Sequence, residues 1–134
     1  MKYVSLLVKP ASGRCNLRCK YCFYEDVSEL REEHDLGLMP EETLERLVRE
    51  AMDLAEVGVS FTFQGGEPML RGLPFYRSLI RFEEQYRKRG LRLSHAIQTN
   101  GTLVNEEWAD FFRQNNFLVG VSLDGTRELH DGNR

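Results

Sequence analysis

Short stretches of alternating apolar and polar residues recur along this chain. In VSFTF, Val59, Phe61 and Phe63 alternate with Ser60 and Thr62, which is the period of a β-strand. The same criteria, including β-branched and aromatic content, predict further strands at residues 2–8, 91–98 and 117–123. Four short strands are therefore expected.

Between these strands, apolar residues fall at the spacing of amphipathic helices. The first helix is predicted between Pro40 and Gly58, and its apolar positions are Leu44, Leu47, Val48, Ala51, Met52 and Ala55. A second helix is predicted from about Pro74, with the basic run 87–89 at its C-terminal end, and a third opens at Asn105. Strands that alternate with helices in this way predict an α/β fold with a parallel sheet.

The two faces of the predicted sheet differ in character. One face carries Val59, Phe61, Phe63, Leu91, Leu93, Ile97, Phe117, Val119, Val121 and Leu123, and helices should cover it. The other carries Ser60, Thr62, Gln64, Ser94, Ala96, Gln98, Asn100, Gly120, Ser122 and Asp124. A sheet buried on both faces would be aliphatic on both, so the second face is predicted to line a cavity. His95 belongs to the apolar set and is predicted to be a buried histidine with one hydrogen-bond partner.

Length and charge narrow the classes of function. With 134 residues and a formal net charge of −3, the chain is one domain or part of one, and no nucleic acid or anionic membrane is implied as a partner. The apolar N-terminal run stops at Lys9 and Pro10, too early for a signal segment or a membrane span. A cytoplasmic location is expected.

All three cysteines of the chain lie within the segment CNLRCKYCFY, where Cys15, Cys19 and Cys22 have the spacing C-x3-C-x2-C. An odd number of thiols cannot pair completely, and a reducing cytosol disfavours disulfides, so metal binding is expected. Structural zinc needs a fourth ligand, and the nearest histidine, His34, follows in a charged segment. A four-iron cluster held by three thiolates instead leaves one iron open for an outside ligand.

Three of the predicted strands end in loops that contain glycine: QGGEP, QTNG and SLDG. Each could be an ordinary turn when taken alone. Together with the cysteine segment after the first strand, these loops place candidate binding residues at the carboxyl edge of the sheet, where parallel α/β proteins bind ligands. In this order, CNLRCKYCFY, FQGGEP and QTNG resemble the N-terminal part of a radical S-adenosylmethionine (SAM) enzyme.

The resemblance implies a TIM-like (β/α)6 barrel, of which residues 1–134 would supply the first four strands in an apparently truncated domain. It implies a [4Fe-4S] cluster on Cys15, Cys19 and Cys22, and SAM chelated to the open iron and cleaved to methionine and a 5′-deoxyadenosyl radical. The cofactor contacts that it implies are Tyr21 by adenine, Gly65 and Gly66 along the methionine moiety, Glu67 near its ammonium group, Ser122 at ribose or carboxylate, Arg134 at a carboxylate, and Gln64 and Asn100 as supports.

Within this superfamily, TFQGGEP, QTNGT and SLDG resemble the anaerobic sulfatase-maturating enzymes. That resemblance implies oxidation of a sulfatase cysteine or serine to formylglycine, with flavodoxin or ferredoxin as the electron donor. Enzymes that build thioether or carbon–carbon cross-links in peptides carry similar motifs, and a non-catalytic zinc or iron–sulfur module is the alternative from another class. The proton acceptor is expected beyond residue 134, and an incomplete barrel is expected to self-associate.

Overall fold

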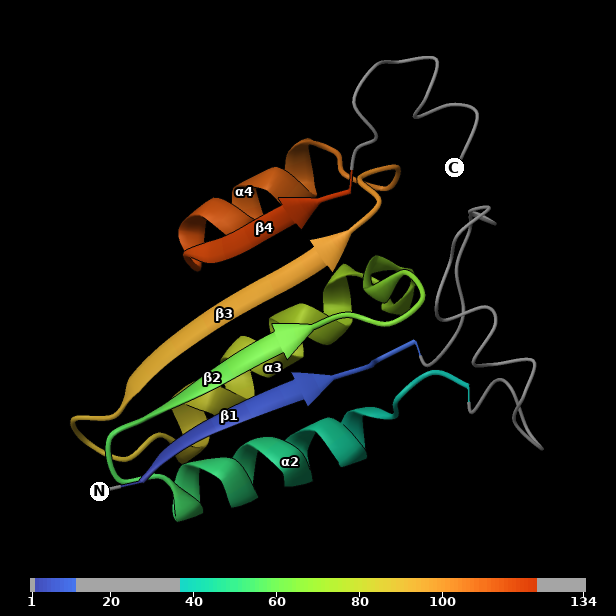
Figure 1. Cartoon of the computed structure of the whole chain (residues 1–134). Helices are drawn as coiled ribbons and strands as arrows, with labels where there is room; N and C mark the ends of the chain where they lie inside the picture. Colours follow the sequence, from blue (N-terminus) through green and yellow to red (C-terminus); the bar gives the residue numbers. More distant parts are fainter. Residues whose placement is uncertain (1, 12–36, 123–134) are drawn as a thin grey trace.

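The computed structural model describes residues 2–11 and 37–122. Strands and helices alternate along the chain (Figure 1). Their order is β1 (Tyr3–Val8), α2 (Glu41–Leu54), β2 (Gly58–Phe63), the 3-10 helix η1 (Pro68–Arg71), α3 (Leu73–Tyr86), β3 (Arg92–Thr99), α4 (Glu106–Gln114) and β4 (Phe117–Val121). The α/β alternation predicted from the sequence is confirmed.

The four strands form one sheet in the order β1-β2-β3-β4, and every neighbouring pair is parallel. Their carboxyl ends therefore point the same way, while the helices lie against one face (Figure 1). Phe61 lies opposite His95, which in turn lies opposite Phe117, so the predicted apolar residues of β2, β3 and β4 share one face. This is the arrangement of consecutive βαβ units. Leu123, which was predicted to belong to this face, and Asp124, predicted on the other, lie outside the described residues.

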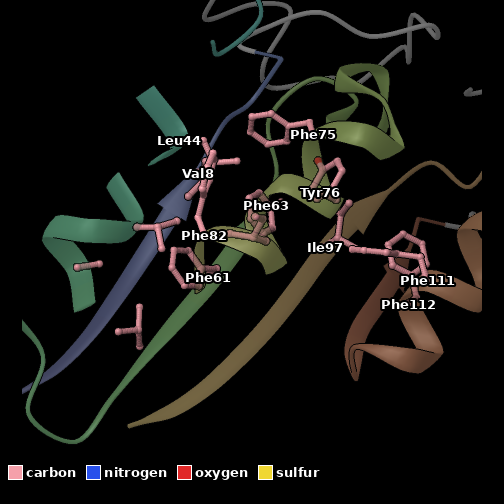
Figure 2. Packing of buried hydrophobic residues seen from close by; sticks show 14 of the residues in the cluster. Val8, Leu44, Phe61, Phe63, Phe75, Tyr76, Phe82, Ile97, Phe111 and Phe112 are labelled. Carbon is pink, nitrogen blue, oxygen red and sulfur yellow. The ribbon is translucent and has the colours of Figure 1, made fainter. Parts of the chain in front are cut away.

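The hydrophobic core fills the space between that face and the helices (Figure 2). Val59, Phe61 and Phe63 of β2 are fully buried, and the helices contribute Leu44, Val48, Met52, Phe75, Tyr76, Leu79, Phe82, Trp108, Phe111 and Phe112. Because β4 is the last described strand, Val121 at its end remains 46% exposed. The described helices therefore leave this end of the apolar face partly uncovered.

The helix ends follow elementary capping rules, with one departure from the sequence prediction. The Asn105 side chain accepts a hydrogen bond from the Trp108 amide at 2.9 Å and caps α4. The basic run 87–89 was predicted to lie in the last turn of α3. However, the helix ends at Tyr86, so the run follows it. Instead, the Arg87 guanidinium donates to the Leu91 carbonyl, which fastens the loop before β3.

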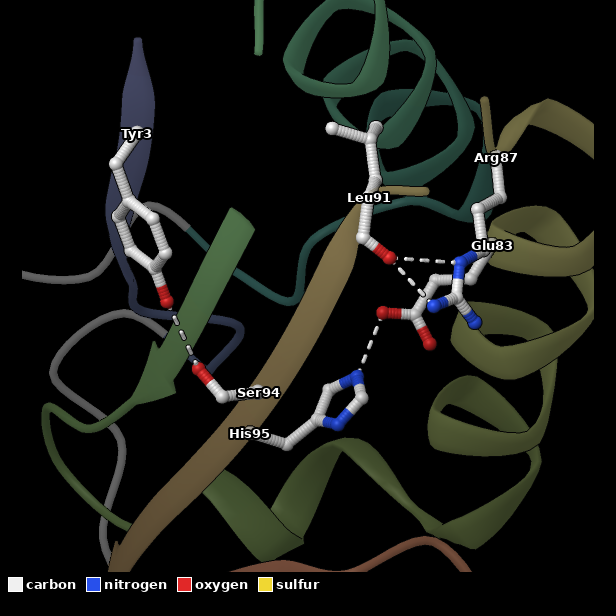
Figure 3. A network of polar contacts seen from close by, with 6 residues as sticks. All are labelled: Tyr3, Glu83, Arg87, Leu91, Ser94 and His95. Carbon is white, nitrogen blue, oxygen red and sulfur yellow. Dashed lines mark hydrogen bonds and ion pairs between the residues drawn. The ribbon is translucent and has the colours of Figure 1, made fainter. Parts of the chain in front are cut away.

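Adjacent residues of β3 point to opposite faces of the sheet (Figure 3). Ser94 Oγ lies 3.4 Å from the Tyr3 hydroxyl on the open face. His95 Nε2 lies 2.6 Å from a carboxylate oxygen of Glu83 on the helix side, and its ring stacks on Phe117 with centroids 4.8 Å apart. The prediction of a buried histidine with a hydrogen-bond partner is confirmed.

The open face is less polar than the sequence suggested. Leu118 is 74% exposed, and its partner in the strand register is Ala96, so it shares the face of the predicted polar residues. On β1, Leu7 and Tyr3 are also exposed on this side. Apolar side chains at both outer strands therefore flank a polar centre. None of the described helices combines the length and apolar content that crossing a membrane requires.

Candidate functional site

The segment that contains the cysteines leaves and rejoins the described structure at the carboxyl edge of the sheet. The Met39 amide donates to the Pro10 carbonyl at 2.7 Å, and the Arg71 guanidinium donates to the Met39 carbonyl, also at 2.7 Å. Pro10 and Ala11 are buried just after β1. Cys15, Cys19, Cys22 and Tyr21 lie outside the described residues, but both ends of their segment are anchored at this edge.

The loop after β2 begins at the same edge with two glycines. The Gln64 amide donates to the Val8 carbonyl at 3.0 Å, which joins the end of β2 to the end of β1. Gly65 and Gly66 have φ values of 88° and 55°, in the left-handed region. A Cβ on Gly65 would also lie 2.9 Å from Cγ of Lys9. Glycine is therefore required for this turn.

Glu67 closes the loop from inside the protein. Its side chain is fully buried, and its carboxylate accepts hydrogen bonds from the Met69 amide at 3.0 Å, the Thr99 hydroxyl at 2.8 Å and the Asn100 amide at 2.8 Å. Met69 belongs to η1, directly after this loop, whereas Thr99 ends β3 and Asn100 begins the loop that follows β3. The carboxylate thus joins two loops at the carboxyl edge.

The Tyr76 side chain of α3 holds the end of the QGGEP loop by a hydrogen bond. Its hydroxyl donates to the Pro68 carbonyl at 2.7 Å. Burial raises the pKa of Tyr76 well above its ordinary value, and the negative charge of Glu67 adds to this shift, while the Arg71 guanidinium opposes it. Tyr76 therefore remains a protonated donor to this loop across the neutral pH range.

The loop after β3 is held by its own polar groups. Oδ1 of Asn100 accepts from the Thr102 amide at 3.0 Å and from the Thr102 hydroxyl at 2.7 Å, an Asx-type turn. Gly101 has a φ of 80°, and a Cβ there would lie 3.1 Å from a methyl group of Val121. The loop therefore packs directly against the end of β4.

β4 brings Ser122 to the same edge. The Ser122 amide donates to the Thr99 carbonyl at 3.1 Å, and its hydroxyl accepts from Nε2 of Gln98 at 2.8 Å. The Gln98 side chain crosses the strand at Gly120, where a Cβ would lie 2.3 Å from the Gln98 Oε1 atom. Gly120 is thus needed for the contact between Gln98 and Ser122.

The structure brings six of the predicted site residues to one edge: Gln64, Gly65, Gly66, Glu67, Asn100 and Ser122. Arg134 lies outside the described residues. Sequence reasoning assigned no role to Thr99 or Gln98, although both join site residues. Thr99 could have been found, because strand alternation places this polar side chain among buried neighbours, where it needs a partner.

The chemistry of this edge fits a polar ligand that carries charged groups. A glycine turn, backbone amides and a hydroxyl suit the amino-acid and ribose parts of a molecule such as SAM. Within residues 2–11 and 37–122, no group of three or more histidine, cysteine, aspartate or glutamate side chains could hold a metal ion. The cysteine segment anchored at the same edge contains the candidate metal ligands.

A parallel α/β sheet with such loops at its carboxyl edge defines a class of ligand-binding enzyme folds. The model of the Radical SAM superfamily matches residues 10–133, and the chain belongs to this superfamily. The fold predicted from the resemblance agrees with this membership and with the four parallel strands.

Similar proteins refine the comparison. The cysteine-type anaerobic sulfatase-maturating enzyme of Clostridium novyi (strain NT) is 53% identical over 131 residues, which are 98% of this chain and 35% of that protein. The serine-type anaerobic sulfatase-maturating enzyme of Bacteroides thetaiotaomicron is 42% identical over 97% of this chain and 31% of its own length. The chain thus spans about a third of the length of these relatives.

A solved structure of native anSMEcpe with bound AdoMet and the peptide Cp18Cys matches with a TM-score of 0.90 and 44% identity, covering 99% of this chain and 35% of that one. A second structure of native anSMEcpe with bound AdoMet matches with a TM-score of 0.91 and 46% identity, covering 98% and 36%. The present fold is therefore also found in solved structures that contain bound AdoMet.

Proposed function

We propose that the polypeptide carrying this chain is an anaerobic sulfatase-maturating enzyme, and that residues 1–134 belong to its radical SAM core domain and bind the cluster and SAM. The observation that carries the proposal is the joining of FQGGEP to QTNG by the buried Glu67 carboxylate at the edge where the cysteine segment is anchored. Sequence identity to sulfatase-maturating relatives supports the same reading.

The cysteine segment supplies the metal ligands in this proposal. Cys15, Cys19 and Cys22 would hold a [4Fe-4S] cluster, with Tyr21 beside the adenine of SAM and Arg134 at a carboxylate. When bound, the cluster and SAM supply one-electron chemistry that abstracts a hydrogen atom from the substrate. Three thiolate ligands agree with a reducing compartment, so a cytoplasmic location is part of the proposal.

The described residues would bind and orient SAM. The Gly65–Gly66 turn places no Cβ of its own beside the methionine moiety, so that its backbone could approach closely. Ser122 reaches the ribose or the carboxylate, with its hydroxyl oriented by Gln98. Gln64 and Asn100 hold their loops at the ends of β2 and β3, with the Gln64 amide bonded to β1.

A sulfatase peptide is the proposed substrate, with its cysteine or serine converted to formylglycine. A cysteine peptide is the first one to test, because the cysteine-type relative is 53% identical and the serine-type one 42%. Flavodoxin or ferredoxin is the proposed electron donor.

The test is anaerobic reconstitution of the polypeptide with iron and sulfide, followed by reduction with SAM and a sulfatase peptide that contains cysteine. Mass spectrometry should find the thiol replaced by an aldehyde, and a peptide with alanine in place of the cysteine should stay unchanged. A thioether or carbon–carbon cross-link without aldehyde would instead indicate another peptide-modifying enzyme. Retention of zinc alone would indicate a non-catalytic module.

A further inference from the structure

We propose that Glu67 and Thr99 form a buried positioning pair that sets the distance between the two SAM-binding loops, and that Glu67 acts through this pair rather than by touching the cofactor. The inference rests on the proposed function, because it concerns the same site. It differs from the role implied by the family resemblance, in which the acid lies near the ammonium group of SAM.

Burial is the first argument. Glu67 is 0% exposed and Thr99 is 2% exposed, so both side chains lie beneath the surface that a ligand would contact. Thr99 belongs to the helix-side set of β3, because it follows His95 and Ile97 at every second position. A ligand on the open face therefore faces the backbone of these loops and not the carboxylate.

The hydrogen bonds of the carboxylate are the second argument. One oxygen accepts from the Asn100 amide at 2.8 Å and the other from the Met69 amide at 3.0 Å, while the Thr99 hydroxyl lies within 2.9 Å of both. These donors lie in, or next to, the two loops that the proposed function assigns to SAM. Protein donors thus already surround the carboxylate, and a buried polar group needs such partners.

Thr99 extends the pair into the turn after β3. Its hydroxyl accepts from the Gly101 amide at 3.1 Å while it donates to Glu67. The chain of hydrogen bonds therefore runs from the Gly101 turn through the hydroxyl to the carboxylate and on to the loop that follows Gly66. Loss of either side chain should change the relative position of the two loops without removing any group from the open face.

Three substitutions in the reconstituted polypeptide test this inference. Thr99→Val keeps the shape but removes the hydroxyl, Thr99→Ser keeps the hydroxyl, and Glu67→Gln removes the charge. Equilibrium dialysis with SAM should show affinity about tenfold weaker for Thr99→Val and for Glu67→Gln. Thr99→Ser should bind within about twofold of the wild type, because its hydroxyl can still donate to the carboxylate.

Ser78→Ala is the matched control. The Ser78 hydroxyl is also buried and donates to a carboxylate, that of Glu41, at 2.8 Å, but this contact joins α2 to α3 rather than the two loops proposed to bind SAM. This variant should lower the melting temperature and leave SAM affinity unchanged. Hydrogen exchange adds a readout that does not depend on the cofactor: the Met69 and Asn100 amides should exchange faster in Glu67→Gln, while the Phe61 amide stays protected.

The outcomes separate this inference from the proposed function. If the wild type does not bind SAM, the proposed function fails, and the exchange rates alone then decide whether the pair positions the loops. If the wild type binds SAM and both Thr99→Val and Glu67→Gln bind within twofold of it, the inference is overturned. Weak binding by Glu67→Gln alone, with normal binding by Thr99→Val, would place the carboxylate on the cofactor and also overturn it.

Discussion

At the scale of single residues, Gly65 shows how backbone conformation and packing act together. Its φ of 88° costs an L-residue about 1–2 kcal/mol, and a Cβ would also meet Lys9 at 2.9 Å. Gly65→Ala should therefore destabilise the fold and shift the turn proposed to meet methionine, with a loss of SAM affinity measured by equilibrium dialysis. Gly90→Ala is the control, because Gly90 has a φ of 85° but open space around it. Equal SAM affinity in both variants would contradict this role for the Gly65 turn.

The buried pair of Glu83 and His95 is a second prediction at this scale. Their side chains are 4% and 8% exposed, so removing one partner leaves a polar group buried without its contact. His95→Phe keeps a ring beside Phe117 but should cost about 1–3 kcal/mol in free energy of unfolding, because a buried hydrogen-bonding group loses its partner. Adding Glu83→Leu should recover part of that loss, because the unpaired carboxylate is gone. Additive losses in denaturant unfolding would show that the two side chains are not coupled.

The residues also show what sequence reasoning can reach. The positions of Gly65 and Gly66 were predictable, because consecutive glycines at a strand end indicate a turn. The contact of Gln98 with Ser122 was not, because it depends on Gly120 lying between them in the neighbouring strand. That requires the register of β3 and β4, which short alternating patterns leave open.

At the scale of elements, η1 and α3 are joined by Tyr76. Because burial raises its native pKa well above the ordinary 10.0, the unfolded chain loses this proton first as the pH rises. The contribution of this raised pKa to the free energy of unfolding is complete below pH 10.0, and it is lost as the pH rises toward the native pKa of Tyr76. Stability measured by urea unfolding should therefore fall less steeply above this pH in Tyr76→Phe than in the wild type. Tyr3→Phe, on the open face, should show the same fall of stability with pH as the wild type. The prediction would be contradicted if stability fell equally steeply in Tyr76→Phe and in the wild type.

The helices and strands were predictable because each periodic segment is long compared with the uncertainty in where it begins and ends. α2 and β2 begin and end within a few residues of the predicted bounds. η1 was missed because QGGEP was interpreted only as a loop at a strand end, whereas its proline, Pro68, also suits the first turn of a helix. The basic run fell outside α3 because Arg87 and Lys88 instead donate to the backbone carbonyls of Leu91 and Asp53.

At the scale of the whole molecule, the described sheet has two outer strands, β1 and β4. Leu118 on β4 is 74% exposed, and outer strands of apolar character pair readily with other chains. The isolated 134-residue chain should therefore self-associate in sedimentation, and Leu118→Lys should reduce this association. Leu54→Lys, at an exposed helix end, is the control and should have little effect. A stable monomer with a cooperative melt would contradict this prediction.

The central claim is that the carboxyl edge of this sheet binds SAM beside a cluster held by the cysteine segment. The most direct measurement is the release of 5′-deoxyadenosine from SAM by the reconstituted and reduced polypeptide. We expect 5′-deoxyadenosine from the wild type and none when Cys15, Cys19 and Cys22 are replaced by alanine. A fully reconstituted wild-type protein that leaves SAM intact, or equal product from the alanine variant, would contradict the account.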